Sequence, residues 1–60
     1  MNWVVYMLKC NDNSIYTGIS NNLNRRLVTH ANGNGSKYVR ARLPFKLIYT
    51  EERLSRSKAI

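Results

Sequence analysis

The N-terminal part of the chain contains two apolar stretches separated by one polar cluster. Residues 3–10 are β-branched, aromatic or apolar almost throughout, which predicts a strand that is buried on both faces. Turn-forming residues follow at 11–14, and residues 15–19 again have the composition of a strand. The pattern therefore predicts a β-hairpin over residues 3–19. Gly18 inside the second strand indicates either a bulge or a close approach by another backbone or a ligand.

An amphipathic helix is predicted directly after the hairpin. Asn21 or Asn22 can cap its start, because a short side-chain acceptor satisfies an otherwise free backbone N–H. The helix then extends to about Ala31 or Asn32, where Gly33 stops it.

Helical periodicity assigns sides to the charged residues of this segment. The apolar positions recur every four residues, at Leu23, Leu27 and Ala31. At about 100° per residue, His30 falls inside this inward-facing stripe and Arg26 falls at its edge. Arg25 falls on the far side, so Arg26 is the one of the two adjacent arginines that is predicted to face the sheet.

The rest of the chain predicts one more strand and the beginning of another helix. After a flexible loop at 32–36, the basic residues 37–43 form either a short helix or a loop. Pro44 leads into a third strand over residues 45–50, whose apolar alternation is only partial. Ser55 has the properties of a helix cap, but only five residues follow it, and an isolated helix that short is not stable. We therefore expect a C-terminally truncated chain.

Together these elements predict an α+β fold, in which a small three-stranded antiparallel sheet is flanked by helices and the last helix is truncated. Residues 1–60 form a single domain, which at this size has a thin margin of stability. The expected core residues are Trp3, Leu23, Leu27, Phe45 and Tyr49. Cys10 is the only cysteine, so we expect a reduced, buried thiol and a cytoplasmic setting.

The charge of the chain favours a polyanionic partner. The net charge is +7, and the only carboxylates are Asp12, Glu51 and Glu52. The long stretch without a carboxylate contains the basic residues Arg25, Arg26, Lys37, Arg40, Arg42 and Lys46. Such a one-sign surface attracts nucleic acid, whereas no strongly amphipathic cationic helix supports a lipid partner. Neither a membrane-spanning run nor a signal peptide is visible.

Four side chains have groups that handle protons and phosphates: Tyr6, Tyr16, Arg26 and His30. A phenol accepts a proton from water only when a nearby cation or a metal-bound water lowers its pKa. An arginine presents paired donors to a phosphoryl oxygen, and a histidine can take or orient the phenol's proton. One shared site requires both tyrosines on one side of the hairpin, so we expect an odd number of turn residues or a bulge. The alternative is that the tyrosines and the histidine are structural.

Several short motifs occur in a fixed order along the chain. They are Val4-Val5-Tyr6, Tyr16-Thr17-Gly18, the segment Asn22-Leu23-Asn24-Arg25-Arg26-Leu27-Val28-Thr29-His30, the segment Gly35-Ser36-Lys37-Tyr38-Val39-Arg40, the tripeptide at 42–44 and the strand at 47–49. This set resembles the GIY-YIG nuclease domain, in particular its small single-domain bacterial (UPF0213-like) members, and covers nearly the whole chain. Val4 and Val5 replace the glycine and isoleucine of the first motif, a mild departure because the tyrosine is the chemical residue.

The resemblance implies a role for each matching residue. Tyr6 would be the general base, and Tyr16 would orient the attacking water or the phosphate. Arg26 would stabilise the negative charge of the transition state, and His30 would support the tyrosine. Gly18 would keep the backbone close to the site.

The basic residues of 37–43 are further candidates for contact with nucleic acid. We expect Lys37, Arg40 and Arg42 to hold phosphates, with a solvated basic loop as the alternative. Tyr38 either stacks on a base or packs on the sheet, and its sequence context favours neither.

The resemblance also implies a Mg²⁺ or Mn²⁺ cofactor, held by a glutamate on the helix after the third strand. Glu51 and Glu52 precede that helix and do not match this position, so we expect the 60-residue chain to be inactive even if its parent protein is a nuclease. Two functions remain open. One is a metal-dependent endonuclease that hydrolyses DNA in repair or processing, with branched DNA or RNA as alternative substrates. The other is a non-catalytic basic nucleic-acid-binding module.

Overall fold

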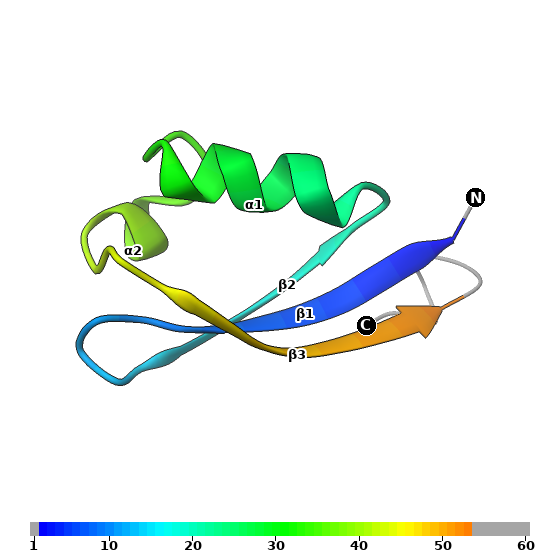
Figure 1. Cartoon of the computed structure of the whole chain (residues 1–60), viewed down its shortest axis with the longest axis horizontal. Helices are drawn as coiled ribbons and strands as arrows, with labels where there is room; N and C mark the ends of the chain where they lie inside the picture. The colour runs from blue at the N-terminus through cyan, green and yellow to red at the C-terminus, as the bar shows by residue number, and fades with distance from the viewer. Residues whose placement is uncertain (1, 54–60) are drawn as a thin grey trace.

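Three strands form the sheet of this protein, and the computed structural model describes residues 2–53. Strands β1 (Trp3–Lys9), β2 (Ile15–Ser20) and β3 (Lys46–Arg53) are arranged in the order β2-β1-β3. Both outer strands are antiparallel to β1, so the N-terminal strand is the centre of the sheet (Figure 1).

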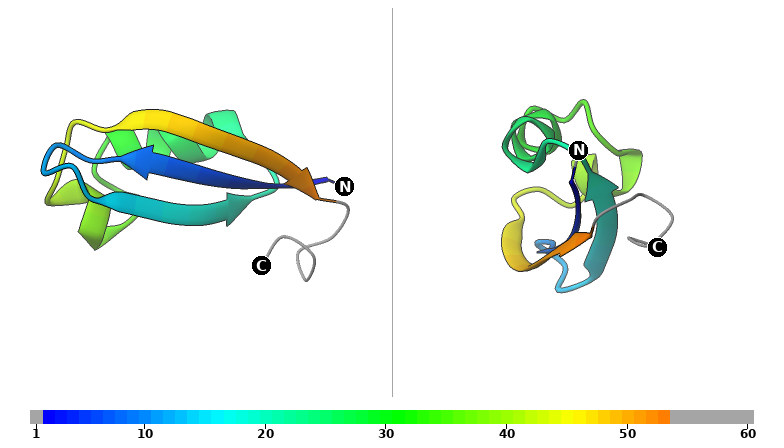
Figure 2. Two further views of the ribbon diagram at one scale, coloured as in Figure 1. Left: turned by 90° about the horizontal axis from the view of Figure 1, so that it is seen from below. Right: turned by 90° about the vertical axis from the view of Figure 1, so that its right-hand side faces the viewer.

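Two helices connect β2 to β3. Helix α1 (Leu23–Ala31) is followed by the single-turn helix α2 (Lys37–Arg40), and both lie over the same face of the sheet (Figures 1 and 2). The predicted α+β architecture with a three-stranded antiparallel sheet is therefore confirmed. The helix predicted from Ser55 lies outside the described residues. No helix in the described part of the chain is long and apolar enough to span a bilayer.

The hairpin connection determines which side chains share a face. Lys9 pairs with Ile15, so five residues form the turn. In this register Tyr6 lies opposite Gly18 and Leu8 lies opposite Tyr16. Because side chains alternate along a strand, Tyr6 and Tyr16 point to the same face, as the expected odd-length turn requires.

The two faces of β1 differ in burial. Tyr6 and Leu8 point toward the helices and are 1% and 0% exposed, whereas Trp3, Val5 and Met7 on the other face are only half-buried. The prediction of a strand buried on both faces is therefore wrong. Its cause is visible in Figure 2, where both helices of the described residues lie on one side of the sheet.

Strand β3 is longer than predicted and contains a register shift. Opposite the Met7–Leu8 step the pairing skips one residue, so Tyr49 pairs with Met7 while Leu47 pairs with Leu8. Leu47 and Tyr49 therefore point to opposite faces. Tyr49 is 42% exposed, so its predicted place in the core is wrong.

The buried cluster lies between the sheet and the helices. Val39 of α2 is fully buried in it, although the sequence did not indicate this residue as part of the core. The partly buried residues packed around the cluster are Tyr16, Leu23, Leu27, Leu43 and Phe45. Leu23, Leu27 and Phe45 thus take their predicted places, while the predicted core residue Trp3 is half-buried.

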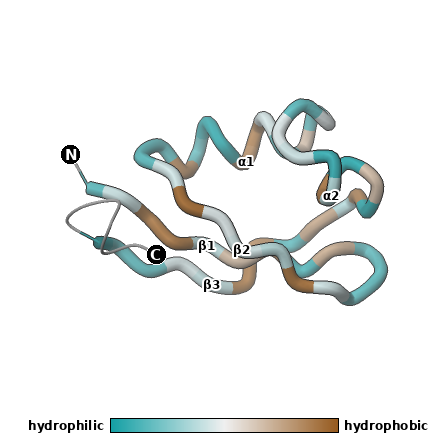
Figure 3. Tube along the Cα trace, turned by 180° about the vertical axis from the view of Figure 1, so that it is seen from behind, coloured by the Kyte–Doolittle hydropathy of each residue, from teal (hydrophilic) through white to brown (hydrophobic). Residues whose placement is uncertain are grey.

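Helix α1 begins and ends at the predicted signals. The side chain of Asn22 accepts a hydrogen bond of 3.1 Å from the backbone N–H of Arg25, and Gly33 has a left-handed φ of 80° just after the helix. Hydrophilic residues make up most of α1, whereas the strands contain the longer hydrophobic stretches (Figure 3). As predicted, Arg26 is half-buried and Arg25 is exposed.

Candidate active site

The phenol of Tyr6 and the imidazole of His30 form the centre of the candidate site. The Tyr6 hydroxyl lies 2.9 Å from Nε2 of His30. Their side chains are 1% and 0% exposed, although one comes from the central strand and the other from the last turn of α1. A buried hydrogen bond between two titratable groups is favourable for proton transfer between them.

Tyr16 and Arg26 complete the group that the sequence predicted. The Tyr16 ring centroid lies 6.4 Å from that of Tyr6 and 5.4 Å from that of His30. The guanidinium of Arg26 interacts with the phenols of both Tyr6 and Tyr16. The structure therefore brings together all four predicted catalytic residues. Three of them are in aromatic contact, and the fourth, Arg26, interacts through hydrogen bonding and charge.

Burial and charge determine the protonation state of this group. Burial raises the pKa of Tyr6, and the opposing effect of the hydrogen bond and charge of Arg26 does not cancel it. Burial, and then the positive charge of Arg26, lower the pKa of His30. The hydrogen bond to Tyr6 raises the pKa of Arg26. At neutral pH the site therefore contains a neutral phenol, a neutral imidazole and a cationic guanidinium.

Two glycines allow the Tyr6–His30 contact. A Cβ on Gly18 would lie 2.5 Å from Cζ and Oη of Tyr6, and a Cβ on Gly35 would lie 2.6 Å from Nδ1 of His30. No real Cβ tolerates such distances. Gly18 was predicted to mark a bulge or a close approach by a backbone or a ligand, and the structure instead shows the side chain of Tyr6 against it. The role of Gly35 was missed, because a glycine in a flexible loop does not indicate which side chain packs against it. Nδ1 of His30 is buried and has no hydrogen-bond partner in the described part of the chain.

A cavity of about 340 Å³ opens beside Arg26. It is lined by Ser20, Asn21, Asn22, Arg25, Arg26 and Thr29. The lining contains two guanidinium groups and no carboxylate, which is a suitable environment for a phosphate. Helical periodicity placed Arg25 away from the sheet, and this placement is correct. It could not show that the cavity lies along the flank of the helix, where Arg25 joins Arg26.

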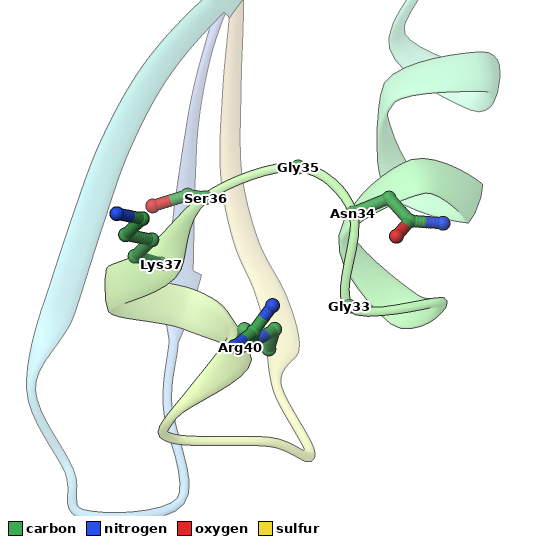
Figure 4. Close-up of a pocket in the computed structure, with 6 residues that line it drawn as sticks. All are labelled: Gly33, Asn34, Gly35, Ser36, Lys37 and Arg40. Atoms are coloured by element: carbon green, nitrogen blue, oxygen red, sulfur yellow. The ribbon is translucent and has the colours of Figure 1, made fainter.

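A second cavity, of about 310 Å³, lies at the loop between the helices. It is lined by Gly33, Asn34, Gly35, Ser36, Lys37 and Arg40. Lys37 and Arg40 extend from α2 next to this loop (Figure 4), and both side chains are exposed. Two of the three predicted phosphate contacts therefore share one basic cavity.

The third predicted contact, Arg42, is engaged within the protein. Its Nε donates a 2.8 Å hydrogen bond to the carboxylate of Asp12, and its guanidinium lies 3.8 Å from the centroid of the Tyr38 ring. Tyr38 in turn stacks on Tyr16, with 6.1 Å between the ring centroids. Of the two possibilities for Tyr38, the structure thus shows packing against the sheet.

The described residues do not form a metal centre. Within residues 2–53 no group of three or more His, Cys, Asp or Glu side chains is placed to hold a metal ion. Asp12 pairs with Arg42, and Glu51 accepts a hydrogen bond from the Tyr49 hydroxyl and pairs with Arg53. Glu51 also lies opposite Val5, on the face of the sheet that points away from Tyr6. These residues do not fit the implied ion, so no chemical step is assigned to a metal here.

Comparison with known proteins identifies the family. A family model described as the GIY-YIG catalytic domain matches residues 2–60. A UPF0213 protein of Oceanobacillus iheyensis is 46% identical over 93% of this chain and 65% of its own length. One from Clostridium perfringens is 57% identical over 85% of this chain and 54% of its own length.

A solved structure supports the same assignment. The solution NMR structure of a UPF0213 protein from Bacillus halodurans matches with a TM-score of 0.57 and 46% identity, over 98% of this chain and 63% of that protein. The chain thus spans between about half and two thirds of the length of these relatives. Since the family model matches residues 2–60 and these relatives are 46–57% identical to the chain, the protein belongs to the GIY-YIG catalytic domain family, a family of nucleases.

Proposed function

We propose that this domain, in a protein that also supplies the metal-binding glutamate, hydrolyses phosphodiester bonds of DNA with Tyr6 as the general base, and that the 60 residues alone are inactive. The observation that carries the proposal is the buried Tyr6–His30 hydrogen bond of 2.9 Å, next to the cationic side chain of Arg26. Membership of a nuclease family supports the reaction class, and the net charge of +7 supports a polyanionic substrate. The biological role that we propose is DNA repair or the processing of unusual DNA structures.

The proton transfers follow from the protonation states. Because burial raises the pKa of Tyr6, its phenol is protonated at neutral pH and must release one proton while it accepts another. The neutral His30 lies within hydrogen-bond distance. The attacking water therefore gives a proton to the phenolic oxygen, and the phenolic proton moves to Nε2 of His30. The oxygen of the water bonds to phosphorus, the P–O bond to the leaving strand breaks, and solvent protonates the leaving oxygen.

The remaining side chains bind and orient the substrate. Arg26 holds a non-bridging oxygen and stabilises the charge that develops on it. Tyr16 lies next to the Tyr6–His30 pair and orients the water or the phosphate. The cavity lined by Arg25 and Arg26 receives the scissile phosphate, while Lys37 and Arg40 contact a neighbouring phosphate of the strand.

GIY-YIG nucleases generally depend on a metal ion. We propose Mg²⁺ or Mn²⁺ for this protein, because such hard cations bind phosphate oxygens together with few protein ligands. The described residues bind and orient the phosphate and move a proton. They form no site for the ion.

A cleavage assay tests the proposal. Linear duplex DNA, branched DNA and a matched RNA are incubated in Mg²⁺ or Mn²⁺ with a longer protein that contains this domain and, in parallel, with the 60-residue chain. Products are resolved on denaturing gels, and cleavage by the 60-residue chain contradicts the expectation that it is inactive. We expect Tyr6→Phe to reduce the cleavage rate about 10²–10⁴-fold, the usual contribution of a general base. Tyr49→Phe is the matched control, because Tyr49 lies on the other face of the sheet. A Tyr6→Phe protein that cleaves at the wild-type rate contradicts the proposal.

The alternative function is a basic module that binds nucleic acid without cleaving it. One observation favours it: the exposed basic side chains that line the two cavities are sufficient to bind a phosphate backbone without a catalytic group. Binding is measured by fluorescence anisotropy of labelled DNA under the same conditions. Steeply salt-dependent binding without product, in either metal and on every substrate, supports this alternative.

A further inference from the structure

We propose that Asp12, Arg42 and Tyr38 are positioning residues that hold the ring of Tyr16 against the Tyr6–His30 pair. The inference rests on the proposed function, in which Tyr16 orients the water or the phosphate. It gives Arg42 a role other than the phosphate contact that its charge suggests.

The first contact of this series joins two aromatic rings. Tyr38 of α2 stacks on Tyr16 of β2, with 6.1 Å between the centroids and 27° between the ring planes. Tyr16 is half-buried and contacts Tyr6 and His30 edge-on or tilted. Tyr38 thus limits the outward movement of Tyr16, while the catalytic pair limits its inward movement.

The second contact holds Tyr38 in place. The guanidinium of Arg42 lies 3.8 Å from the centroid of the Tyr38 ring, and its Nη1 donates a 3.0 Å hydrogen bond to the backbone carbonyl of Tyr38. The same group donates from Nε to Asp12. A planar guanidinium can stack and donate in two directions at once, which the ammonium group of lysine cannot do.

The third contact ties Arg42 to the hairpin turn. Asp12 accepts hydrogen bonds from the backbone N–H and the hydroxyl of Ser14, and these bonds, more than Arg42, lower the pKa of its carboxyl. The backbone N–H of Asn11 also donates a 2.9 Å bond to the carbonyl of Arg42. The turn that joins the two tyrosine strands thus holds the arginine that supports one of the tyrosines.

An NMR experiment on the protein tests the contacts directly. The probes are the NOEs between the ring protons of Tyr16 and those of Tyr6 and His30. We expect Tyr38→Leu and Arg42→Lys to weaken these NOEs, while the backbone amide spectrum stays that of a folded protein. Tyr38→Phe keeps the ring and should preserve them. Arg40→Lys is the control for a neighbouring arginine, since Arg40 is exposed on α2.

Cleavage kinetics provide the second measurement. We expect Tyr38→Leu and Arg42→Lys to lower kcat about 10–100-fold with little change in KM, as a misplaced orienting group does. Tyr38→Phe keeps the ring, so its kcat should stay close to the wild-type value. Asp12→Asn removes only the charge at the hairpin turn. We therefore expect it to weaken the NOEs and lower kcat as well, but by less than Tyr38→Leu or Arg42→Lys.

Two outcomes overturn the inference. One is a set of Tyr16 NOEs that persists unchanged in both Tyr38→Leu and Arg42→Lys. The other is an Arg42→Lys protein with an unchanged kcat but a raised KM, which identifies Arg42 as a phosphate contact. The proposed function fails separately, if Tyr6→Phe cleaves at the wild-type rate. The NOEs then still decide whether the position of Tyr16 depends on Tyr38 and Arg42.

Discussion

The phenolic oxygen of Tyr6 lies 2.9 Å from Nε2 of His30, within the hydrophobic core of the protein. Small domains ordinarily fill that position with apolar side chains. Here the largest fully buried side chains include a phenol and an imidazole, so the same contact belongs both to the core and to the candidate site. Changes to the site should therefore affect stability as well as activity.

Replacing either glycine beside the pair should separate Tyr6 from His30. Gly18→Ala places a methyl group against the phenol of Tyr6, and Gly35→Ala places one against the imidazole of His30. We expect each change to lower the free energy of unfolding by about 1–3 kcal/mol, as overpacking does. Urea denaturation measures the effect. Asn24→Ala, at an exposed position of α1, is the control and should stay within about 0.5 kcal/mol. Wild-type stability in both glycine variants contradicts the close packing.

The stability of the protein should fall as the pH decreases from 7 to 5. Burial and Arg26 lower the pKa of His30 in the folded state, so below its ordinary value near 6.5 the unfolded chain binds the extra proton more readily. The free energy of unfolding therefore decreases as the pH falls, by at most about 1.4 kcal/mol per pH unit for one group.

The matched variant for this test is His30→Gln, which can still hydrogen-bond to Tyr6 but does not titrate. Urea denaturation at several pH values should give a steeper dependence between pH 7 and pH 5 for the wild type than for the variant. Equal slopes show that His30 is not the group responsible. The carboxyl of Asp12 does not interfere in this range, because its pKa is lowered from 3.8.

The capping hydrogen bond of Asn22 should contribute measurably to the stability of α1. Its side chain accepts from the backbone N–H of Arg25 at 3.1 Å. Asn22→Ala removes the acceptor and should lower the free energy of unfolding by about 1 kcal/mol. Asn22→Ser retains an acceptor and should cost much less. If the two variants unfold at the same urea concentration, the cap makes no net contribution.

The salt dependence of DNA binding should distinguish basic residues that contact phosphates from one that is paired within the protein. Arg25→Ala and Lys37→Ala each remove an exposed cation from a basic cavity. Each should reduce the slope of log K against log salt by about 0.9 on duplex DNA, the value for one lost phosphate contact. Arg42→Ala should leave the slope unchanged, because its guanidinium is paired with Asp12. Fluorescence anisotropy between 50 and 200 mM salt is a suitable measurement. An equal reduction in all three variants contradicts this assignment.

Local spacing along the chain was sufficient to predict the hairpin, a helix capped by Asn21 or Asn22, and the sides of that helix on which Arg26 and His30 lie. The strand signals depend on a two-residue period and the helix signals on a period of 3.6. Both periods can be read from neighbouring residues, which is why the inward position of His30 and the edge position of Arg26 were predictable. The length of the turn could not be predicted from spacing: an odd number of residues was expected only because one shared site requires it, and the register of the structure confirms it.

Contacts between distant segments could be resolved only in three dimensions. The charge of Arg42 suggests a phosphate contact, and only the structure shows that it pairs with Asp12, 30 residues earlier. Gly35 acquired a role because the loop folds back over His30, and the register shift in β3 turned Tyr49 outward. Each of these three features depends on how distant elements pack and pair. A charged residue, a glycine or an apolar residue is compatible with several packing arrangements, and only the complete fold determines which one forms.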